Sequence, residues 1–307
     1  MFVIKWKVHN NQIFVMGGDD GSIFNDVWSS SDGATWVEVT STSGWSARTG
    51  LTSVVYDNQI FVMGGWDGSA ALNDVWSSSD GADWNLVAGT ASWSARFGTT
   101  CTVYDNKMFV MGGDNGSSKL NDVWSSTDGS TWTEVTATAG WSARSGPASV
   151  VYNNQMFVIG GRWEVNDVWS SVDGATWSLV TDAAAWSSRR SHRCVVYDNR
   201  IFLMGGFDGV SAIHNDVWSS DGGANWVEVT SGAGWSARYG MNSIVYHNKI
   251  YVIGGKDGSF KLNDVWNMGK VLNPKVLSES TVTVIQTVWY SGQLALVGGA
   301  AIRYLNN

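Results

Sequence analysis

The stretch Leu51-Thr-Ser-Val-Val-Tyr56, Asp57-Asn58, Gln59-Ile-Phe-Val-Met-Gly-Gly65 decides the fold class. Two runs rich in β-branched and aromatic residues, joined by an Asp-Asn pair, predict a tight antiparallel hairpin. Farther along, Asn73-Asp-Val-Trp-Ser77 predicts a third strand, and Asp83-Trp-Asn-Leu-Val87 predicts a fourth after a Ser-Asp-Gly turn. The stretch therefore predicts four short strands that pair in chain order.

This four-strand pattern recurs along the chain. Sixteen of the 20 Trp residues belong to it. Its clearest element, Asn-Asp-Val-Trp, returns at steps of 48, 48, 45, 49 and 48 residues, beginning at Asn25, Asn73, Asn121, Asn166, Asn215 and Asn263. Four antiparallel strands that repeat at such a period are typical of a β-propeller blade. We therefore expect a single all-β propeller domain over residues 1–307, built of four-stranded antiparallel blades.

The number of blades follows from the inner hairpins. Gly-Gly pairs begin at residues 17, 64, 112, 160, 205, 254 and 298, and the segment before the last pair aligns with the inner hairpin of the preceding copy. This pattern predicts seven blades with an incomplete last one, at approximately 1–43, 44–91, 92–139, 140–184, 185–233, 234–278 and 279–307. A six-blade ring with a C-terminal extension is the alternative.

The repeat resembles the Kelch repeat, a resemblance carried by Ile60-Phe-Val-Met-Gly-Gly65, Trp76 and Trp84 and covering residues 1 to about 266. It implies a Kelch-type propeller. In Kelch domains that bind acidic peptides, an Arg just before the first inner strand reaches the ligand, and the matching positions here are Arg48, Arg96, Arg144, Arg189 and Arg238. Kelch rings usually close by placing strands from both termini in one blade, whereas the first blade here is complete by itself.

Those five Arg residues end a recurring segment, which we call the linker, between the fourth strand of one blade and the first strand of the next. The first linker reads Gly44-Trp-Ser-Ala-Arg48. Guanidinium groups suit carboxylate, phosphate or sulfate, each of which accepts two parallel hydrogen bonds. The structural alternative is that each Arg stacks on the linker Trp or pairs with a neighbouring carboxylate, namely Asp20, Asp67, Asp208 or Asp257.

Two positions vary among otherwise similar copies. They are the residue after Gly-Gly and the residue after the linker Arg. In a propeller, the loops that carry them share one face around the mouth of the central channel, which we call the channel-mouth face. Constant scaffold positions beside variable face positions are typical of a recognition surface, although drift at unconstrained loop positions produces the same pattern. The predicted ligand-binding residues are therefore the five linker Arg residues together with Trp66, Arg162, Trp163, Arg190, Phe207 and Tyr239.

Composition narrows the function classes. The net charge of −8 and the lack of Lys/Arg runs argue against nucleic acid, and no apolar run is long enough to span a membrane. The four His residues fall at different repeat positions, so neither a metal site nor another cofactor is predicted.

Cys101 and Cys194 occupy equivalent strands of blades separated by one blade, which predicts buried free thiols. The N-terminus does not resemble a signal peptide, which leaves a cytoplasmic protein or a trimmed secreted one.

The sequence favours a non-enzymatic interaction propeller that recognises an acidic or polar ligand, either a peptide or a glycan. One alternative is a carbohydrate-active enzyme similar to the Kelch-like sialic acid mutarotases, with Glu164 as acid or base. Another is a structural repeat protein in a larger assembly, which associates with itself through the incomplete last blade.

Overall fold

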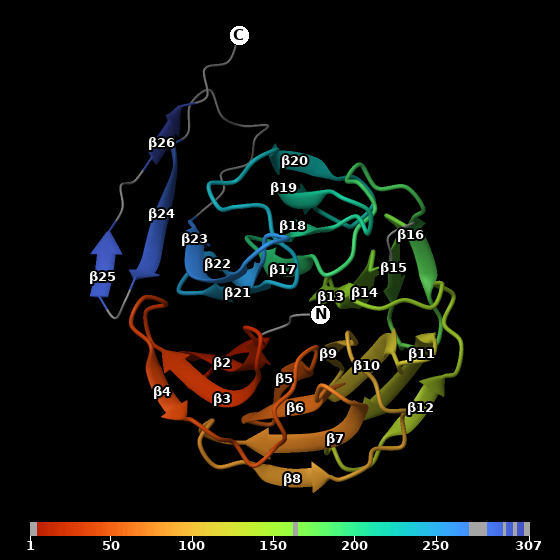
Figure 1. Cartoon of the computed structure of the whole chain (residues 1–307). Helices are drawn as coiled ribbons and strands as arrows, with labels where there is room; N and C mark the ends of the chain where they lie inside the picture. Colours follow the sequence, from red (N-terminus) through yellow and green to blue (C-terminus); the bar gives the residue numbers. More distant parts are fainter. Residues whose placement is uncertain (1–4, 162–164, 270–280, 291–292, 297–299, 304–307) are drawn as a thin grey trace.

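The structure, a computed structural model, is a closed ring of antiparallel sheets around a central channel (Figure 1). It describes residues 5–161, 165–269, 281–290, 293–296 and 300–303. For Lys5, Trp6 and the strands after Gly269 it describes the backbone alone. No membrane-spanning helix occurs among the described residues.

Each of the first three blades is a four-stranded sheet whose strands pair in chain order. Blade 1 contains β1 (Lys5–His9), β2 (Gln12–Asp19), β3 (Ile23–Ser30) and β4 (Val37–Thr40). Blade 2 contains β5 (Thr52–Tyr56), β6 (Gln59–Trp66), β7 (Ala71–Ser78) and β8 (Asn85–Ala88). Blade 3 contains β9 (Thr100–Tyr104), β10 (Lys107–Asp114), β11 (Lys119–Ser126) and β12 (Thr133–Thr136).

Blades 4 and 5 repeat this arrangement, and blade 6 departs from it at its outer edge. Blade 4 contains β13 (Ala148–Tyr152), β14 (Gln155–Ile159), β15 (Val168–Ser171) and β16 (Ser178–Thr181). Blade 5 contains β17 (Arg193–Tyr197), β18 (Arg200–Phe207), β19 (Ile213–Ser220) and β20 (Val227–Thr230). Blade 6 contains β21 (Asn242–Tyr246), β22 (Lys249–Lys256), β23 (Lys261–Met268) and β24 (Thr281–Tyr290), to which β25 (Gln293–Leu296) and β26 (Ala300–Arg303) also pair.

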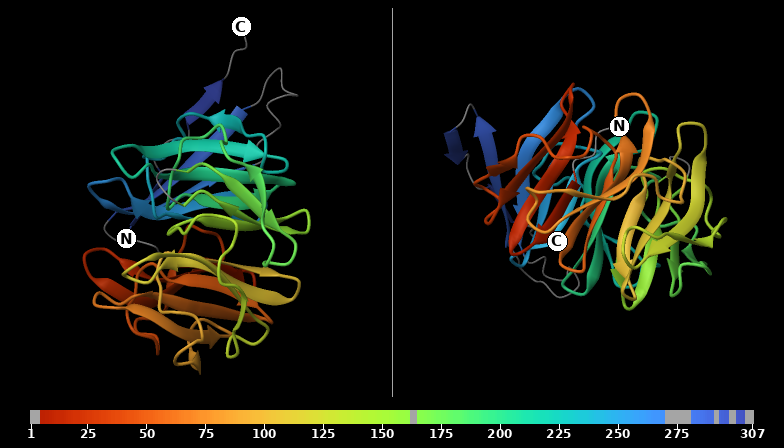
Figure 2. Two further views of the ribbon diagram at one scale, coloured as in Figure 1. Left: turned by 90° about the vertical axis from the view of Figure 1, so that its right-hand side faces the viewer. Right: turned by 90° about the horizontal axis from the view of Figure 1, so that it is seen from below.

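The prediction of seven blades is wrong, because the ring has six. The expected seventh hairpin forms as β24 and β25, but β24 pairs with β23 and so supplies the fourth strand of blade 6. The strand β26 pairs with Thr281–Val284 of β24, whereas β25 pairs with Thr287–Tyr290. Figures 1 and 2 show these three strands beside the ring, outside the circle of inner strands. The ring leaves no position for a seventh blade, since β21 packs directly against β1.

The recurring turns of the sequence set the backbone of every blade. The Asp-Asn pair of the inner hairpin takes positive φ at both residues, 45° at Asp57 and 54° at Asn58, which matches the twist of a two-residue hairpin. The Gly-Gly pair forms a bulge between the second and third strands. A Cβ on Gly64 would lie 2.8 Å from the carbonyl oxygen of Arg96, so glycine lets the next linker approach the sheet.

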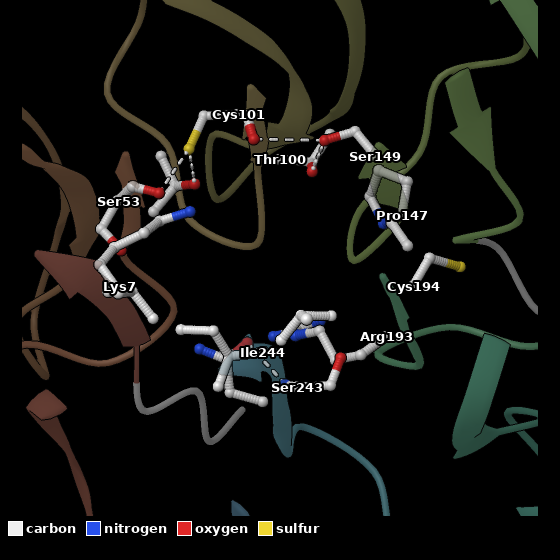
Figure 3. Close-up of a pocket in the computed structure, with 15 residues that line it drawn as sticks. Lys7, Ser53, Thr100, Cys101, Pro147, Ser149, Arg193, Cys194, Ser243 and Ile244 are labelled. Carbon is white, nitrogen blue, oxygen red and sulfur yellow. Dashed lines mark hydrogen bonds between the residues drawn. The ribbon is translucent and has the colours of Figure 1, made fainter. Parts of the chain in front are cut away.

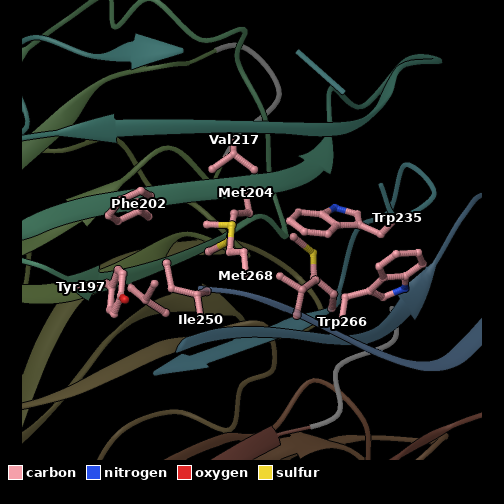
Figure 4. Packing of buried hydrophobic residues seen from close by; sticks show 11 residues of the cluster. Tyr197, Phe202, Met204, Val217, Trp235, Ile250, Trp266 and Met268 are labelled. Atoms are coloured by element: carbon pink, nitrogen blue, oxygen red, sulfur yellow. The ribbon is translucent and has the colours of Figure 1, made fainter. Parts of the chain in front are cut away.

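The hydrophobic core is divided among the six junctions between neighbouring blades. Figure 4 shows the junction of blades 5 and 6, where Phe202 and Met204 of one sheet meet Ile250 and Trp266 of the next around the linker residue Trp235. Equivalent clusters occur at the other four junctions that contain a linker. Burial of apolar area between sheets is therefore the main attraction that closes the ring.

The inner hairpins also join each blade to its neighbour. In blades 2–6, the hydroxyl of the Tyr that ends the first strand donates to the carbonyl of a turn Asn in the next blade, as Tyr104 does to Asn154 at 2.9 Å. Tyr246 of blade 6 donates in the same way to Asn11 of blade 1 at 2.7 Å. Blade 1 has His9 at this position, and its Nε2 lies 2.8 Å from the carbonyl oxygen of Ser79 in blade 2. The hairpin end of the ring is thus closed without sharing strands of the two termini in one blade.

Candidate ligand-binding sites

The five linker Arg residues lie inside the junctions, with side chains 0–1% exposed. Each guanidinium forms a two-pronged ion pair with the Asp of the Asn-Asp-Val-Trp motif in the following blade. The Nη1–Oδ1 distances are 2.5–2.7 Å and the Nη2–Oδ2 distances are 2.7–2.8 Å. The pairs are Arg48–Asp74, Arg96–Asp122, Arg144–Asp167, Arg189–Asp216 and Arg238–Asp264.

The remaining donors of each guanidinium are also used. In Arg96, Nη1 donates to the carbonyl of Gly112 at 3.0 Å, while Nε and Nη2 donate to the carbonyl and the hydroxyl of Ser94. A guanidinium has five N–H donors, and all five are satisfied here. The other four linkers repeat these bonds. Ligand binding by these side chains would require breaking buried ion pairs.

The partner carboxylates differ from the four that the sequence suggested. Asp67, for example, accepts hydrogen bonds from the backbone of its own turn, at Ser69 and Ala70, instead of an Arg. The stacking alternative agrees with the structure at three linkers, where the Arg Cζ lies 5.7–5.8 Å from the centre of the linker Trp ring. The signal that sequence reasoning missed is an Asp at a nearly constant distance after each linker Arg.

The linker Trp residues are packing residues. Trp45, Trp93, Trp141, Trp186 and Trp235 are 1–2% exposed, and within the described part of the chain the indole N–H of each has no hydrogen-bond partner. Four of them meet the Trp that immediately precedes the fourth strand of the next blade edge to face, at centroid distances of 5.9–6.0 Å. An aromatic platform for a ligand would have to be exposed, so these five rings do not form one.

The two variable positions lie together, as the sequence suggested. The residue after the linker Arg pairs through the backbone with the residue after Gly-Gly of the next blade, as in Thr49 with Trp66 and Arg190 with Phe207. Side chains then meet between neighbouring blades. Trp66 contacts Phe97 edge to face at 5.4 Å, and Phe207 stacks on Tyr239 at 5.3 Å. We call these six residues the rim: Thr49, Trp66, Phe97, Arg190, Phe207 and Tyr239. Three residues that the sequence analysis singled out, Arg162, Trp163 and Glu164, lie outside the described residues.

The rim surrounds one end of the channel. Immediately beyond the rim positions, the amide of Gly98 donates to the carbonyl of Gly50, Gly146 to Gly98, Ser191 to Gly146 and Gly240 to Ser191. This backbone arc draws five blades together around the channel. A cavity of about 300 Å³ opens between Trp66 and Phe97 and is also lined by Gly50 of the arc.

The channel itself holds two cationic side chains, Lys7 of β1 and Arg193 of β17, in a cavity of about 250 Å³ (Figure 3). Small polar residues of the other inner strands, including Ser53, Thr100 and Ser243, complete its wall. No described residue of that wall is acidic, although the whole chain carries a net charge of −8. The channel is therefore positive within an acidic protein.

Several polar groups of the channel lack partners. Arg193 Nε, Ser53 Oγ and Ser243 Oγ are buried and have no hydrogen-bond partner among the described residues. Arg193 Nη1, in contrast, donates a hydrogen bond to the carbonyl of His192 at 2.9 Å. Donors that are buried without an acceptor are costly unless a ligand or water satisfies them.

Burial also changes the titration of the two cations. Desolvation lowers the pKa of Lys7, and the nearby Arg193 lowers it further. Desolvation lowers the pKa of Arg193 to about 10, so this guanidinium stays charged at neutral pH. An anion placed between the two would favour both charged forms.

The two Cys residues are free, as expected. They are half-buried in the channel wall, however, and not fully buried. Burial raises the pKa of Cys194, which keeps its thiol protonated. Among the described residues, no cluster of three or more His, Cys, Asp or Glu side chains is arranged to hold a metal ion.

Comparison with known families agrees with this architecture. The family model described as the KLHDC2/KLHL20/DRC7 Kelch-repeats domain matches residues 3–161 and 82–206. The model described as the DUF6242 beta propeller domain matches residues 147–270. No curated protein matches the chain. The first model alone covers more than half of the sequence.

Proposed function

Because this chain belongs to the Kelch-repeat β-propeller family, whose domains are compatible with interaction roles, we propose that it is a non-enzymatic binding module for an anionic ligand. The ligand places a carboxylate or a similar group in the channel between Lys7 and Arg193. The observation that carries the proposal is the pair of cations in a wall whose described residues include no acid. Buried charges are ordinarily paired, and here the ligand supplies the counter-charge.

The rim supports a ligand longer than a single ion. One member of each aromatic pair stands on the same segment as the channel wall, because Phe97 precedes Thr100 by three residues and Tyr239 precedes Asn242 by three. Trp66, Phe97, Phe207 and Tyr239 are half-buried and offer apolar faces at the channel mouth. Aromatic side chains around a few fixed polar groups are typical of ligand sites. An acidic peptide and an acidic glycan both fit this description, because each carries anionic groups such as carboxylates.

The test measures binding of two probes by calorimetry, an oligo-glutamate peptide and an oligosaccharide of uronic acids. We expect at least one of them to bind, with an affinity that falls as salt rises. Arg193→Gln and Lys7→Gln should each weaken binding about tenfold or more, since a hydrogen bond to a charged group contributes roughly 1.5–3 kcal/mol. Lys107→Gln removes an exposed charge outside the channel and is the matched control. Binding that both channel variants leave unchanged would contradict the channel site.

A further inference from the structure

Among the described residues, no linker fills the junction between blades 6 and 1, whereas a linker fills each of the other five. A cavity of about 660 Å³ lies there, lined by Gly255, Leu262 and Asn263 of blade 6 and by Val15, Asp26 and Trp28 of blade 1. We call it the 6–1 groove. Each of these six residues occupies a repeat position that contacts or adjoins a linker at the other junctions of the ring.

The blade 6 side of the groove matches the backbone seat of a linker. In the second linker, the amide of Arg96 donates to the carbonyl of Leu72, and its carbonyl accepts from the amide of Gly65. Asn73 Nδ2 donates to the carbonyls of Ala91 and Trp93. The counterparts of these three seat residues are Leu262, Gly255 and Asn263. Asn263 Nδ2 has no recorded partner among the described residues, and Asn263 is exposed where its five counterparts are half-buried.

The blade 1 side matches the side-chain seat. Asp26 corresponds to the five Asp residues that pair with linker Arg residues, yet among the described residues its only recorded hydrogen bond comes from the Trp28 indole at 2.8 Å. Val15 is half-buried, whereas its counterparts Val62, Val110, Val158, Leu203 and Val252 are 0% exposed. The acceptor for an arginine and part of the apolar slot for a tryptophan are therefore both present.

We propose that the 6–1 groove docks a segment of a partner protein that carries a Trp and, three residues later, an Arg. Five linkers of this chain show how such a segment binds to a seat of this kind. The carboxylate of Asp26 supplies charge complementarity to the guanidinium, and Trp and Arg are the side chains most often found at interaction hot spots. This chain's own Trp-x-x-Arg segments are buried in their own junctions, so a second copy would have to open its ring to supply one.

One ion pair already crosses the groove. Lys261 Nζ of blade 6 lies 2.5 Å from Asp19 Oδ1 of blade 1. This pair occupies Asp19 and leaves Asp26 as the acceptor for the incoming arginine. It also links the two blades directly beside the seat.

The test uses a fluorescein-labelled peptide with the sequence of residues 42–50 of this chain, Thr-Ser-Gly-Trp-Ser-Ala-Arg-Thr-Gly. Fluorescence anisotropy with the intact chain should show saturable binding. Peptides in which the Trp is replaced by Ala, or the Arg by Gln, should bind at least tenfold more weakly. Absence of saturable binding would overturn the proposal, including the case in which the chain's own residues already occupy the groove.

Two protein variants locate the binding. Asp26→Asn should weaken the peptide at least tenfold, and Asn263→Ala should weaken it several-fold. Glu38→Gln, which removes an exposed carboxylate from β4 of the same blade, is the matched control and should leave affinity unchanged. Asn263 is exposed, so its replacement keeps the test valid if Asp26→Asn shifts the urea midpoint. Binding that survives both groove variants would place the peptide elsewhere and overturn the proposal.

Discussion

The junction of blades 3 and 4 and the junction of blades 6 and 1 are built from the same repeat, but they are closed differently. Both have the hydrogen bond at the hairpin end, from Tyr104 to Asn154 and from Tyr246 to Asn11. At the other end, the 3–4 junction contains a buried Trp and the Arg144–Asp167 ion pair. The 6–1 junction has a cavity there. The comparison shows that the apolar sheet faces close the ring, whereas the linkers fill and lock individual junctions.

The largest effect should come from breaking one locked junction. Arg144→Met leaves Asp167 without its partner, and removing one member of a buried ion pair costs about 3–5 kcal/mol of unfolding free energy. Urea unfolding measures this loss. The double change Arg144→Met with Asp167→Leu should recover part of it, because no unpaired charge remains. If the single variant is as stable as the parent protein, the ion pair does not lock the junction.

A smaller change in the unfolding free energy should come from His192, a residue present at one of the five linker-filled junctions and at none of the other four. His192 follows the linker of the 4–5 junction, where the 5–6 junction has Met241. Burial, together with the adjacent Arg189 and Arg193, lowers the pKa of His192 to about 3. The unfolded chain, in which the pKa of a His is about 6.5, therefore binds one more proton than the folded chain between these two pH values. The stability that His192 contributes is complete above about pH 6.5 and is lost as the pH falls.

At pH 5, this group should lower the unfolding free energy by about 2 kcal/mol relative to pH 7. His192→Met should remove that loss, which urea unfolding at the two pH values would measure. His247→Asn, at an exposed hairpin turn, is the control and should keep the parent's acid dependence. An unchanged pH dependence in His192→Met would show that His192 is not responsible.

Much of the architecture could be predicted from the sequence because it depends on local chemistry. The Asp-Asn turns, the Gly-Gly bulges and the alternating strands all follow from residues close together in the chain. The number of blades could not be predicted in the same way. The segment that forms β24 and β25 has the pattern of an inner hairpin, but its position depends on which strand β24 pairs with. Local sequence does not specify a pairing partner.

The candidate site was harder to predict. The five linker Arg residues were expected at the ligand because their partners lie 23–27 residues away, in another blade. A paired repeat of Arg and Asp was the available signal. The cations of the channel were missed because they do not repeat. Lys7 stands where other blades have Val54 or Ile244, and Arg193 stands where they have Thr52 or Asn242. A charged residue at an otherwise apolar or neutral repeat position was the available signal for them.

The most direct measurement compares the same substitution in the two kinds of junction. Asp122→Asn and Asp26→Asn change one motif at equivalent positions, and the new side chain can still accept from the indoles of Trp124 and Trp28, which now donate to these carboxylates. Urea unfolding should show a loss of about 3–5 kcal/mol for Asp122→Asn, which leaves Arg96 buried and unpaired. The loss for Asp26→Asn should be below about 1 kcal/mol. Equal losses would contradict the account, because they would mean that the 6–1 junction is locked like the others.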